Sequence, residues 1–204
     1  MMTEILHCSH PLALERALAV LRAGGLIAFP TDTVYGVASL ATDAQAIERL
    51  FFAKARDLRK AIPILIGDHT HLEQITTSLP QSARKLSEKF WPGALTIILP
   101  RNPALPDVLS REPTVGVRMP NHAFALDLLR QAGPLATTSA NLSGGANPQN
   151  AHDVLMQLCG RIELVLDGGE TPGSVASTVV DCTGEQPTIL RQGVLSAETL
   201  FAAL

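Results

Sequence analysis

Residues 54–66 read Lys54-Ala55-Arg56-Asp57-Leu58-Arg59-Lys60-Ala61-Ile62-Pro63-Ile64-Leu65-Ile66, and they indicate the architecture of the whole chain. The second half of this stretch is apolar almost without interruption, as expected of a strand that is covered on both faces. Strands of this kind are typical of a sheet buried between helices, so residues 62–66 predict an α/β protein.

The first half of the same stretch is basic. Residues 54–60 hold four cations, in a chain of 204 residues whose net charge is only -3. Cations that gather in the connection between a helix and a strand often bind phosphate. Lys and Arg carry the opposite charge, and the planar guanidinium of Arg also fits the geometry of phosphate. A solvated helix end, whose cations offset the helix dipole, explains the segment equally well when it is taken alone.

Hydrophobic periodicity on either side extends this pattern along the chain. Helices are predicted at residues 11–22, 43–54, 81–90, 123–131, 151–158 and 196–204. Strands are predicted at residues 26–29, 62–66, 94–99, 115–119, 135–138, 162–166, 177–181 and 188–191. Some strands follow one another without a helix between them, which predicts a mixed sheet of α/β (α+β) class. Because no linker or repeat interrupts the pattern, we expect residues 1–204 to form a single domain.

Amino-acid composition indicates what kind of core the chain builds and which classes of partner it disfavours. Hydrophobic residues make up 46 % of the chain and aromatic residues only 4 %, so the core must be built mainly from aliphatic side chains. The near-neutral charge argues against strong nucleic-acid binding by the whole surface. Three scattered cysteines, Cys8, Cys159 and Cys182, predict free thiols in a reducing compartment. No signal peptide or membrane span is evident, so we expect a cytoplasmic protein without a membrane partner.

Two polar segments accompany the basic one. Residues 30–36 read Pro-Thr-Asp-Thr-Val-Tyr-Gly, and residues 137–144 read Thr-Thr-Ser-Ala-Asn-Leu-Ser-Gly. An ordinary turn explains the first segment, and a helix cap with a turn explains the second, when each is taken alone. Since all three polar segments follow apolar strand-like runs, they predict one site built from loops at strand ends. The common phosphate loop and the dinucleotide fingerprint are both absent from the sequence.

Seven motifs follow one another in a specific order along the chain. They are Pro30–Gly36, Lys54–Lys60, Trp91–Gly93, Val117–Pro120, Thr138–Gly144, Ser177–Asp181 and Leu190–Gly193. In this order the chain resembles the YrdC-type L-threonylcarbamoyladenylate synthases, from about Leu12 to Gly193. No single motif carries the resemblance; their number and order do.

The resemblance implies an open, twisted α/β sheet flanked by helices around a basic cavity. It also implies a nucleotidyltransferase that joins L-threonine, bicarbonate and ATP into threonylcarbamoyl-AMP and releases pyrophosphate. That product supplies a modified adenosine of tRNA. Mg²⁺ is expected to accompany ATP, without a dedicated metal site in the protein. The resemblance is also compatible with protein partners in tRNA modification and with weak binding of RNA.

Site residues follow from the resemblance position by position. Threonine binding is implied for Thr33, Arg118, Thr138, Ser139, Ser143 and Ser177. ATP binding is implied for Arg56, Lys60, Thr114, Ala140, Asn141 and Arg191. Within the basic segment, Lys54 and Arg56 are expected to be catalytic, because negative charge accumulates on the phosphates as pyrophosphate leaves.

The chain departs from its relatives at three places. Leu65 stands where many relatives carry a His, and Asp57 stands where they often carry Pro. Longer relatives also continue into a linker and a second domain. Simpler roles are predicted for two other kinds of side chain. Trp91 is predicted to be a packing anchor rather than an adenine platform, and no metal site is expected at His69 and His71.

Two rival functions remain open at this point. A non-catalytic RNA-binding module could use the same cations, and a paralogue with the same fold could act on another substrate. Hydroxyl and amide side chains at Thr33, Ser139, Asn141 and Ser177 suit a small amino acid better than a duplex. RNA binders also tend to display aromatic side chains, which are scarce in this chain.

Overall fold

One mixed sheet runs through the protein. The computed structural model describes residues 2–172 and 176–204. Its strands are β1 (Glu4–His7), β2 (Ile27–Phe29), β3 (Gly36–Leu40), β4 (Ile64–Leu65), β5 (Leu95–Pro100), β6 (Thr114–Arg118), β7 (Leu135–Ser139), β8 (Leu164–Asp167), β9 (Thr178–Asp181) and β10 (Thr188–Arg191). In space these described strands follow the order β1-β8-β2-β3-β7-β4-β6-β5-β9-β10.

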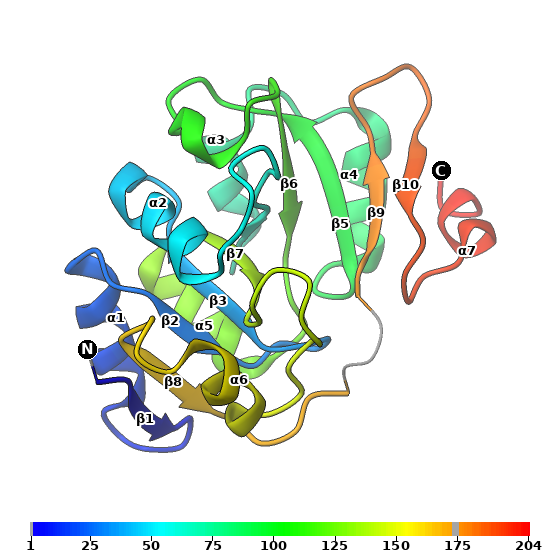
Figure 1. Ribbon diagram of the computed structural model, residues 1–204. Coiled ribbons are helices and arrows are strands. Elements are labelled where there is room, and N and C mark those ends of the chain that lie inside the picture. Colours follow the sequence, from blue (N-terminus) through cyan, green and yellow to red (C-terminus); the bar gives the residue numbers. More distant parts are fainter. Residues whose placement is uncertain (1, 173–175) are drawn as a thin grey trace.

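Helices surround this sheet. They are α1 (Ala13–Arg22), α2 (Ala44–Ala53), α3 (Leu72–Ile75), α4 (Gln81–Phe90), α5 (Ala123–Ala132), α6 (Ala151–Leu158) and α7 (Ala197–Phe201), with 3-10 turns η1 (His69–His71) and η2 (Asp107–Leu109). Figure 1 shows the sheet twisting from β1 at one edge to β10 at the other, which leaves it open. The sheet contains parallel pairs such as β2 with β8 and β5 with β9, and antiparallel pairs such as β3 with β7. The predicted fold class, an open mixed α/β sheet, is confirmed.

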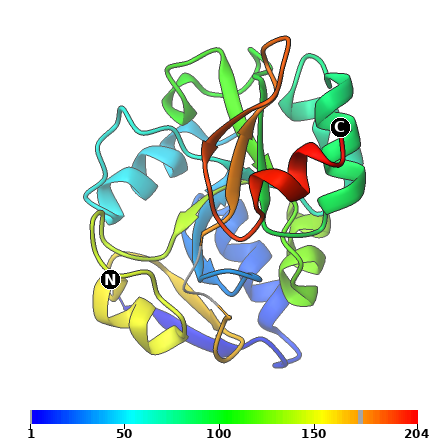
Figure 2. The same ribbon diagram turned by 90° about the vertical axis from the view of Figure 1, so that its right-hand side faces the viewer.

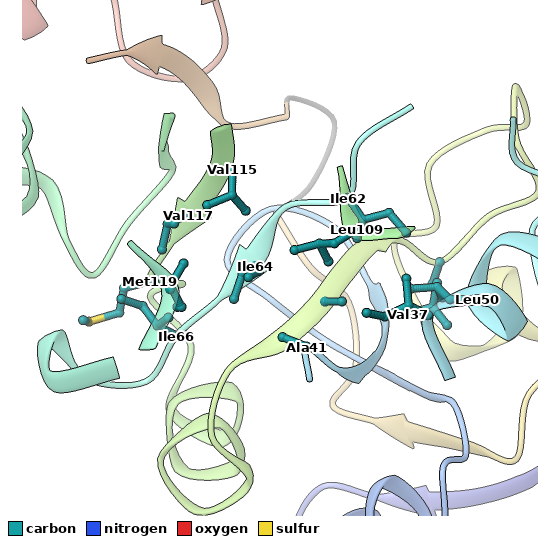
Figure 3. Packing of buried hydrophobic residues seen from close by; sticks show 14 of the residues in the cluster. Val37, Ala41, Leu50, Ile62, Ile64, Ile66, Leu109, Val115, Val117 and Met119 are labelled. Carbon is teal, nitrogen blue, oxygen red and sulfur yellow. The ribbon is translucent and has the colours of Figure 1, made fainter. Parts of the chain in front are cut away.

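Alternating side chains divide the core between the two faces of the sheet. On β2, Ile27 and Phe29 pack in one apolar cluster with side chains of α1 and α5, whereas Ala28 belongs to a second cluster. The second cluster includes Val37, Leu50 of α2 and Val117 of β6, and Figure 3 shows its packing. Aliphatic residues dominate both clusters, as the composition predicted.

Helix caps agree with the sequence more closely than helix lengths do. Asp43 accepts a hydrogen bond from the backbone N of Ala46 at 3.0 Å, and Ser196 accepts one from Thr199 at 3.2 Å. Each is the first residue of its predicted helical range, where Asp and Ser favour the N-cap position. Helix α1 begins at Ala13 rather than at residue 11, and α7 ends at Phe201 rather than at the last residue. The turned view of Figure 2 shows α7 beside α4.

The two strands β1 and β3 were not predicted. β1 pairs in parallel with β8 at the edge of the sheet, and β3 pairs with β2 on one side and β7 on the other. None of the helices in residues 2–172 and 176–204 combines the length and apolar character that crossing a bilayer requires.

Candidate active site

The loop between β2 and β3 is the first part of the site, and it is held in place by its own hydroxyl groups. Thr31 donates from Oγ1 to the carbonyl oxygen of Val34 at 2.7 Å. Its hydroxyl also lies 3.1 Å from that of Thr33. Beyond the loop, the backbone N of Ala140 donates to the carbonyl oxygen of Tyr35 at 2.8 Å. This bond ties the first predicted polar segment to the second.

A buried ion pair joins this loop to β6. The guanidinium of Arg118 donates to Asp32 Oδ1 through Nη2, to Thr33 Oγ1 through Nη1 at 3.0 Å, and to the carbonyl oxygen of Gly93 through Nε at 3.0 Å. Burial lowers the pKa of Arg118, and the carboxylate of Asp32 opposes that effect. The structure thus brings together Thr33 and Arg118, two of the residues expected to bind threonine.

A second hydroxyl group and a second guanidinium meet at β9 and β10. The Oγ atom of Ser177 lies 2.8 Å from Oγ1 of Thr96 on β5. Arg191 donates from Nη2 to the carbonyl oxygen of Ser177 at 2.9 Å and to its Oγ at 3.3 Å. The charge of Arg191 also contributes to the lowering of the Arg118 pKa, after burial.

Lys54 lies inside the protein, with 1 % of its surface exposed. Its ammonium donates to the carbonyl oxygens of Ser139 and Asn141, and it lies 3.5 Å from Asn141 Oδ1. In return, the backbone N of Ser143 donates to the carbonyl oxygen of Lys54 at 2.9 Å. Burial lowers the pKa of Lys54 to about 7, with the charge of Arg56 as the second cause. This lysine therefore fastens the polar loop after β7.

The other cations of the basic segment lie nearer the surface. Arg56 follows Ala55, whose φ of 49° is rare for a residue with a side chain. Its guanidinium turns back to donate to the carbonyl oxygens of Lys60 at 3.3 Å and Ala61 at 2.9 Å. Arg59 forms an ion pair with Asp57 at 2.6 Å. Lys60 is exposed.

Some predicted site residues do not meet the others directly. Thr138 pairs with Val37 across β3 and β7 and is half-buried, and Ala140 is buried. Thr114 begins β6 whereas Arg118 ends it, so about 13 Å of strand separates their backbones. The residue of this strand that was expected to bind ATP and the one expected to bind threonine therefore lie at its two ends.

Leu65 and Trp91 both pack in the core. Leu65 is buried in the cluster that includes side chains of α1 and α5 and pairs with Arg118 across β4 and β6. Trp91 is buried and donates from Nε1 to the carbonyl oxygen of Leu95 at 2.7 Å, which confirms its role as a packing anchor. Its ring lies 5.9 Å from that of His69. Across the described residues, no three His, Cys, Asp or Glu side chains gather as a metal site would require.

A cavity of about 580 Å³ opens beside the Asp32–Arg118 pair. Its lining includes Asp32, Thr33, Gly93, Lys89 and Asn121. Sequence reasoning gave no role to Asp32, Lys89, Asn121 or Thr96. A signal existed for Asp32 alone, because it lies within the motif at residues 30–36.

Comparison with known proteins supports a family assignment. The family model Sua5/YciO/YrdC, described as "Telomere recombination", matches residues 19–193. The threonylcarbamoyl-AMP synthase of Bacillus subtilis is 42 % identical over 194 residues, which cover 94 % of this chain and 56 % of that protein. The threonylcarbamoyl-AMP synthase of Pyrococcus abyssi is 42 % identical over 186 residues, which cover 90 % of this chain and 55 % of that protein. The chain thus spans a little over half the length of these two relatives.

Solved structures agree with the sequence matches. The crystal structure of P. abyssi Sua5 complexed with L-threonine aligns with a TM-score of 0.93 and 38 % identity, covering 100 % of this chain and 60 % of that one. Escherichia coli YciO aligns with a TM-score of 0.85 and 25 % identity, covering 97 % of this chain and 98 % of that one. Because the family model spans most of the sequence and the fold is shared, this chain belongs to the Sua5/YciO/YrdC family.

Proposed function

We propose that the protein is an L-threonylcarbamoyladenylate synthase, a nucleotidyltransferase that uses L-threonine, bicarbonate and ATP. The observation that carries the proposal is the buried contact of Arg118 with Thr33 and Asp32 beside the cavity. A guanidinium next to hydroxyl groups suits the carboxylate and side chain of a small hydroxy amino acid. The names of the relatives from B. subtilis and P. abyssi support the same activity.

The proposed reaction has two steps. The neutral amine of threonine first forms a carbamate, either by adding to carbon dioxide with loss of one proton or by reacting with bicarbonate with loss of one water. A carbamate oxygen then attacks the α-phosphorus of ATP, and pyrophosphate leaves. Because charge develops on the phosphates, fixed cations supply most of the stabilisation. Mg²⁺ would enter with ATP as part of the substrate.

Arg56, Lys60 and Arg191 are the cations that we assign to the nucleotide. Lys54 acts in this proposal by fixing the loop after β7, since its ammonium already donates to carbonyl oxygens there. We extend the proposal to the remaining residues that the family pattern implies. They are Thr114, Ala140 and Asn141 for ATP, and Thr138, Ser139, Ser143 and Ser177 for threonine.

The proposal also covers the domain organisation, the protein partners and the cellular compartment. Residues 1–204 would act as one domain, and the product would pass to proteins that modify tRNA. Cys8, Cys159 and Cys182 are free thiols, which fits a protein of the reducing cytoplasm.

Pyrophosphate release from ATP tests the proposed function. The purified protein should release pyrophosphate only when threonine and bicarbonate are both present, because the carbamate is the nucleophile. Omitting either one should reduce the rate to the background of ATP alone. Equal release without threonine would indicate a plain ATP pyrophosphatase and would contradict the proposal.

A further inference from the structure

Asp32 has an unused hydrogen-bonding face beside the cavity. Arg118 donates to its Oδ1 atom, and within residues 2–172 and 176–204 no donor reaches Oδ2. The Asp32 side chain is 15 % exposed and lines the cavity of about 580 Å³. A carboxylate oxygen can accept more than one hydrogen bond. Asp32 can therefore receive a donor from a ligand without giving up Arg118.

Arg118 also retains donors. A guanidinium carries five N–H groups, and three of its nitrogens each donate to one of Asp32, Thr33 and Gly93. The second N–H groups on Nη1 and Nη2 have no acceptor among the described residues, and the guanidinium lies directly behind the lining residues Asp32, Thr33 and Gly93. A carboxylate and a guanidinium with free capacity thus lie side by side in a mostly buried setting.

We propose that Asp32 binds the α-amino group of the amino acid substrate while Arg118 binds its carboxylate. This inference rests on the proposed function and adds to it a residue that positions the reacting nitrogen. The Asp32–Arg118 pair carries no net charge, and neither does a zwitterionic amino acid. The ammonium of the zwitterion would contact Asp32 and its carboxylate would contact Arg118, while Asp32 and Arg118 stay paired with each other.

The charges around the cavity favour Asp32 for this role. Asp32 is the acidic residue among the described lining residues, whereas Lys89 would repel an ammonium. The neighbouring hydroxyl of Thr33 already accepts from Arg118, so it is a weaker acceptor for a cation than a free carboxylate oxygen. Asp32 forms and breaks no covalent bond in this role. It holds the nitrogen where carbon dioxide or bicarbonate can reach it, and the ammonium gives one proton to solvent or to a bicarbonate ion before it reacts as the neutral amine.

Two ligands that differ only at the nitrogen test the inference. L-threonine is compared with 2,3-dihydroxybutanoate of matching configuration, in which a hydroxyl group replaces the ammonium. Calorimetric titration of the full chain should show wild type preferring threonine by about 10-fold to 100-fold, as expected for a hydrogen bond between charged groups. Asp32→Asn keeps the size of the side chain and should reduce this preference to about 3-fold or less.

Asp57→Asn is the matched control. Asp57 pairs with Arg59 on the surface, so this variant loses a carboxylate without touching the cavity and should keep the wild-type preference. If Asp32→Asn keeps that preference, Asp32 does not bind the amino group and the inference is overturned. The proposed function would still stand in that case, provided that pyrophosphate release requires threonine.

Asp32→Asn also weakens the partner of the buried Arg118, so its fold is checked by thermal melting. Should it fail to fold, Asp32→Glu replaces it in the titration. This variant keeps a charge for Arg118 but moves the carboxylate by one methylene group, and we expect the preference for threonine to fall several-fold. An unchanged preference in a folded Asp32→Glu protein would overturn the inference, as would a wild type that binds both ligands equally.

Discussion

The four cations of residues 54–60 look equivalent in the sequence but have different environments in the structure. Lys54 is buried and donates to loop carbonyl oxygens, whereas the Arg59 side chain is 76 % exposed and pairs with Asp57. Arg56 lies between these extremes and braces the turn at Ala61. The environment of each cation therefore depends on where it lies relative to the turn at Ala61, and not on whether it is a Lys or an Arg.

Replacing Arg56 should affect activity far more than replacing Arg59. We expect Arg56→Ala to lose ~10²-fold or more in kcat/KM while remaining folded, because removing one preorganised donor to developing charge typically costs about 3 to 4 kcal/mol. Arg59→Ala removes only an exposed ion pair, and such pairs contribute at most about 1 kcal/mol. Pyrophosphate release and melting temperature, measured on both variants, check this. Similar losses in the two would show that the roles within residues 54–60 are assigned wrongly.

At the level of residues, the sequence offered candidates for the site but did not predict their contacts. The family pattern placed Thr33 and Arg118 on the same ligand, and the structure joins them at 3.0 Å. It gave no role to Asp32, because the partner of a carboxylate depends on how distant strands lie together. Nothing in residues 30–36 indicates that Arg118 is the side chain that Asp32 meets.

Among the secondary-structure elements, β1 and β3 were missed for physical reasons. β3 reads Gly-Val-Ala-Ser-Leu, and Gly and Ala have low strand propensity. Its extended form comes from hydrogen bonds to β2 and β7 on both sides, which no local pattern reveals. β1 is a short edge strand of alternating half-buried and exposed residues. The elements that were predicted, such as α2 and β5, carry long apolar patterns of their own.

The segment after β10 depends on a close backbone approach. A Cβ atom added at Gly193 would lie 2.1 Å from the carbonyl oxygen of Ala176 and 2.5 Å from the carbonyl carbon of Ser177. The backbone at Ala176 and Ser177 and the backbone at Gly193 cannot move apart without a cost in free energy. Any side chain at residue 193 must therefore push the chain after β10 away from Ser177. Arg191, two residues earlier, depends on the same approach to reach Ser177.

We therefore expect Gly193→Ala to destabilise the protein by about 1 to 3 kcal/mol and to reduce kcat/KM by at least ~10-fold. Gly184→Ala is the control in the connection between β9 and β10, where an added Cβ would meet only the carbonyl oxygen of Gln186 at 3.8 Å. It should change stability by no more than about 0.5 kcal/mol. Urea denaturation and pyrophosphate release measure both effects. Equal behaviour of the two variants would mean that Arg191 does not need this contact.

Across the whole molecule, the site draws on strands from both halves of the sheet. Asp32 and Thr33 come from the loop between β2 and β3, Arg118 ends β6, and Ser177 and Arg191 belong to the β9–β10 region. Figure 1 shows the twist of this sheet. The cavity lining combines Asp32 and Thr33 with Ala94 before β5 and Val194 and Leu195 after β10. Sequence periodicity predicts such a sheet, but not which strand ends converge, since convergence depends on strand order.

If the proposed function holds, this arrangement should limit how well the protein separates threonine from related amino acids. Serine differs from threonine by one methyl group, whose apolar contact contributes only ~1 to 3 kcal/mol, so we expect threonine to be preferred by no more than ~200-fold in kcat/KM. Leu65, which replaces the His of many relatives, is buried in an apolar cluster and offers no hydrogen bond to the hydroxyl. Valine keeps the shape of threonine but would leave the polar groups near Thr33 and Ser177 unpaired, so it should be the poorest substrate. Steady-state rates of pyrophosphate release with the three amino acids test this order. If valine matched or exceeded serine, the pocket would recognise the shape of the side chain rather than its hydroxyl group. The roles given to Thr33 and Ser177 would then be wrong.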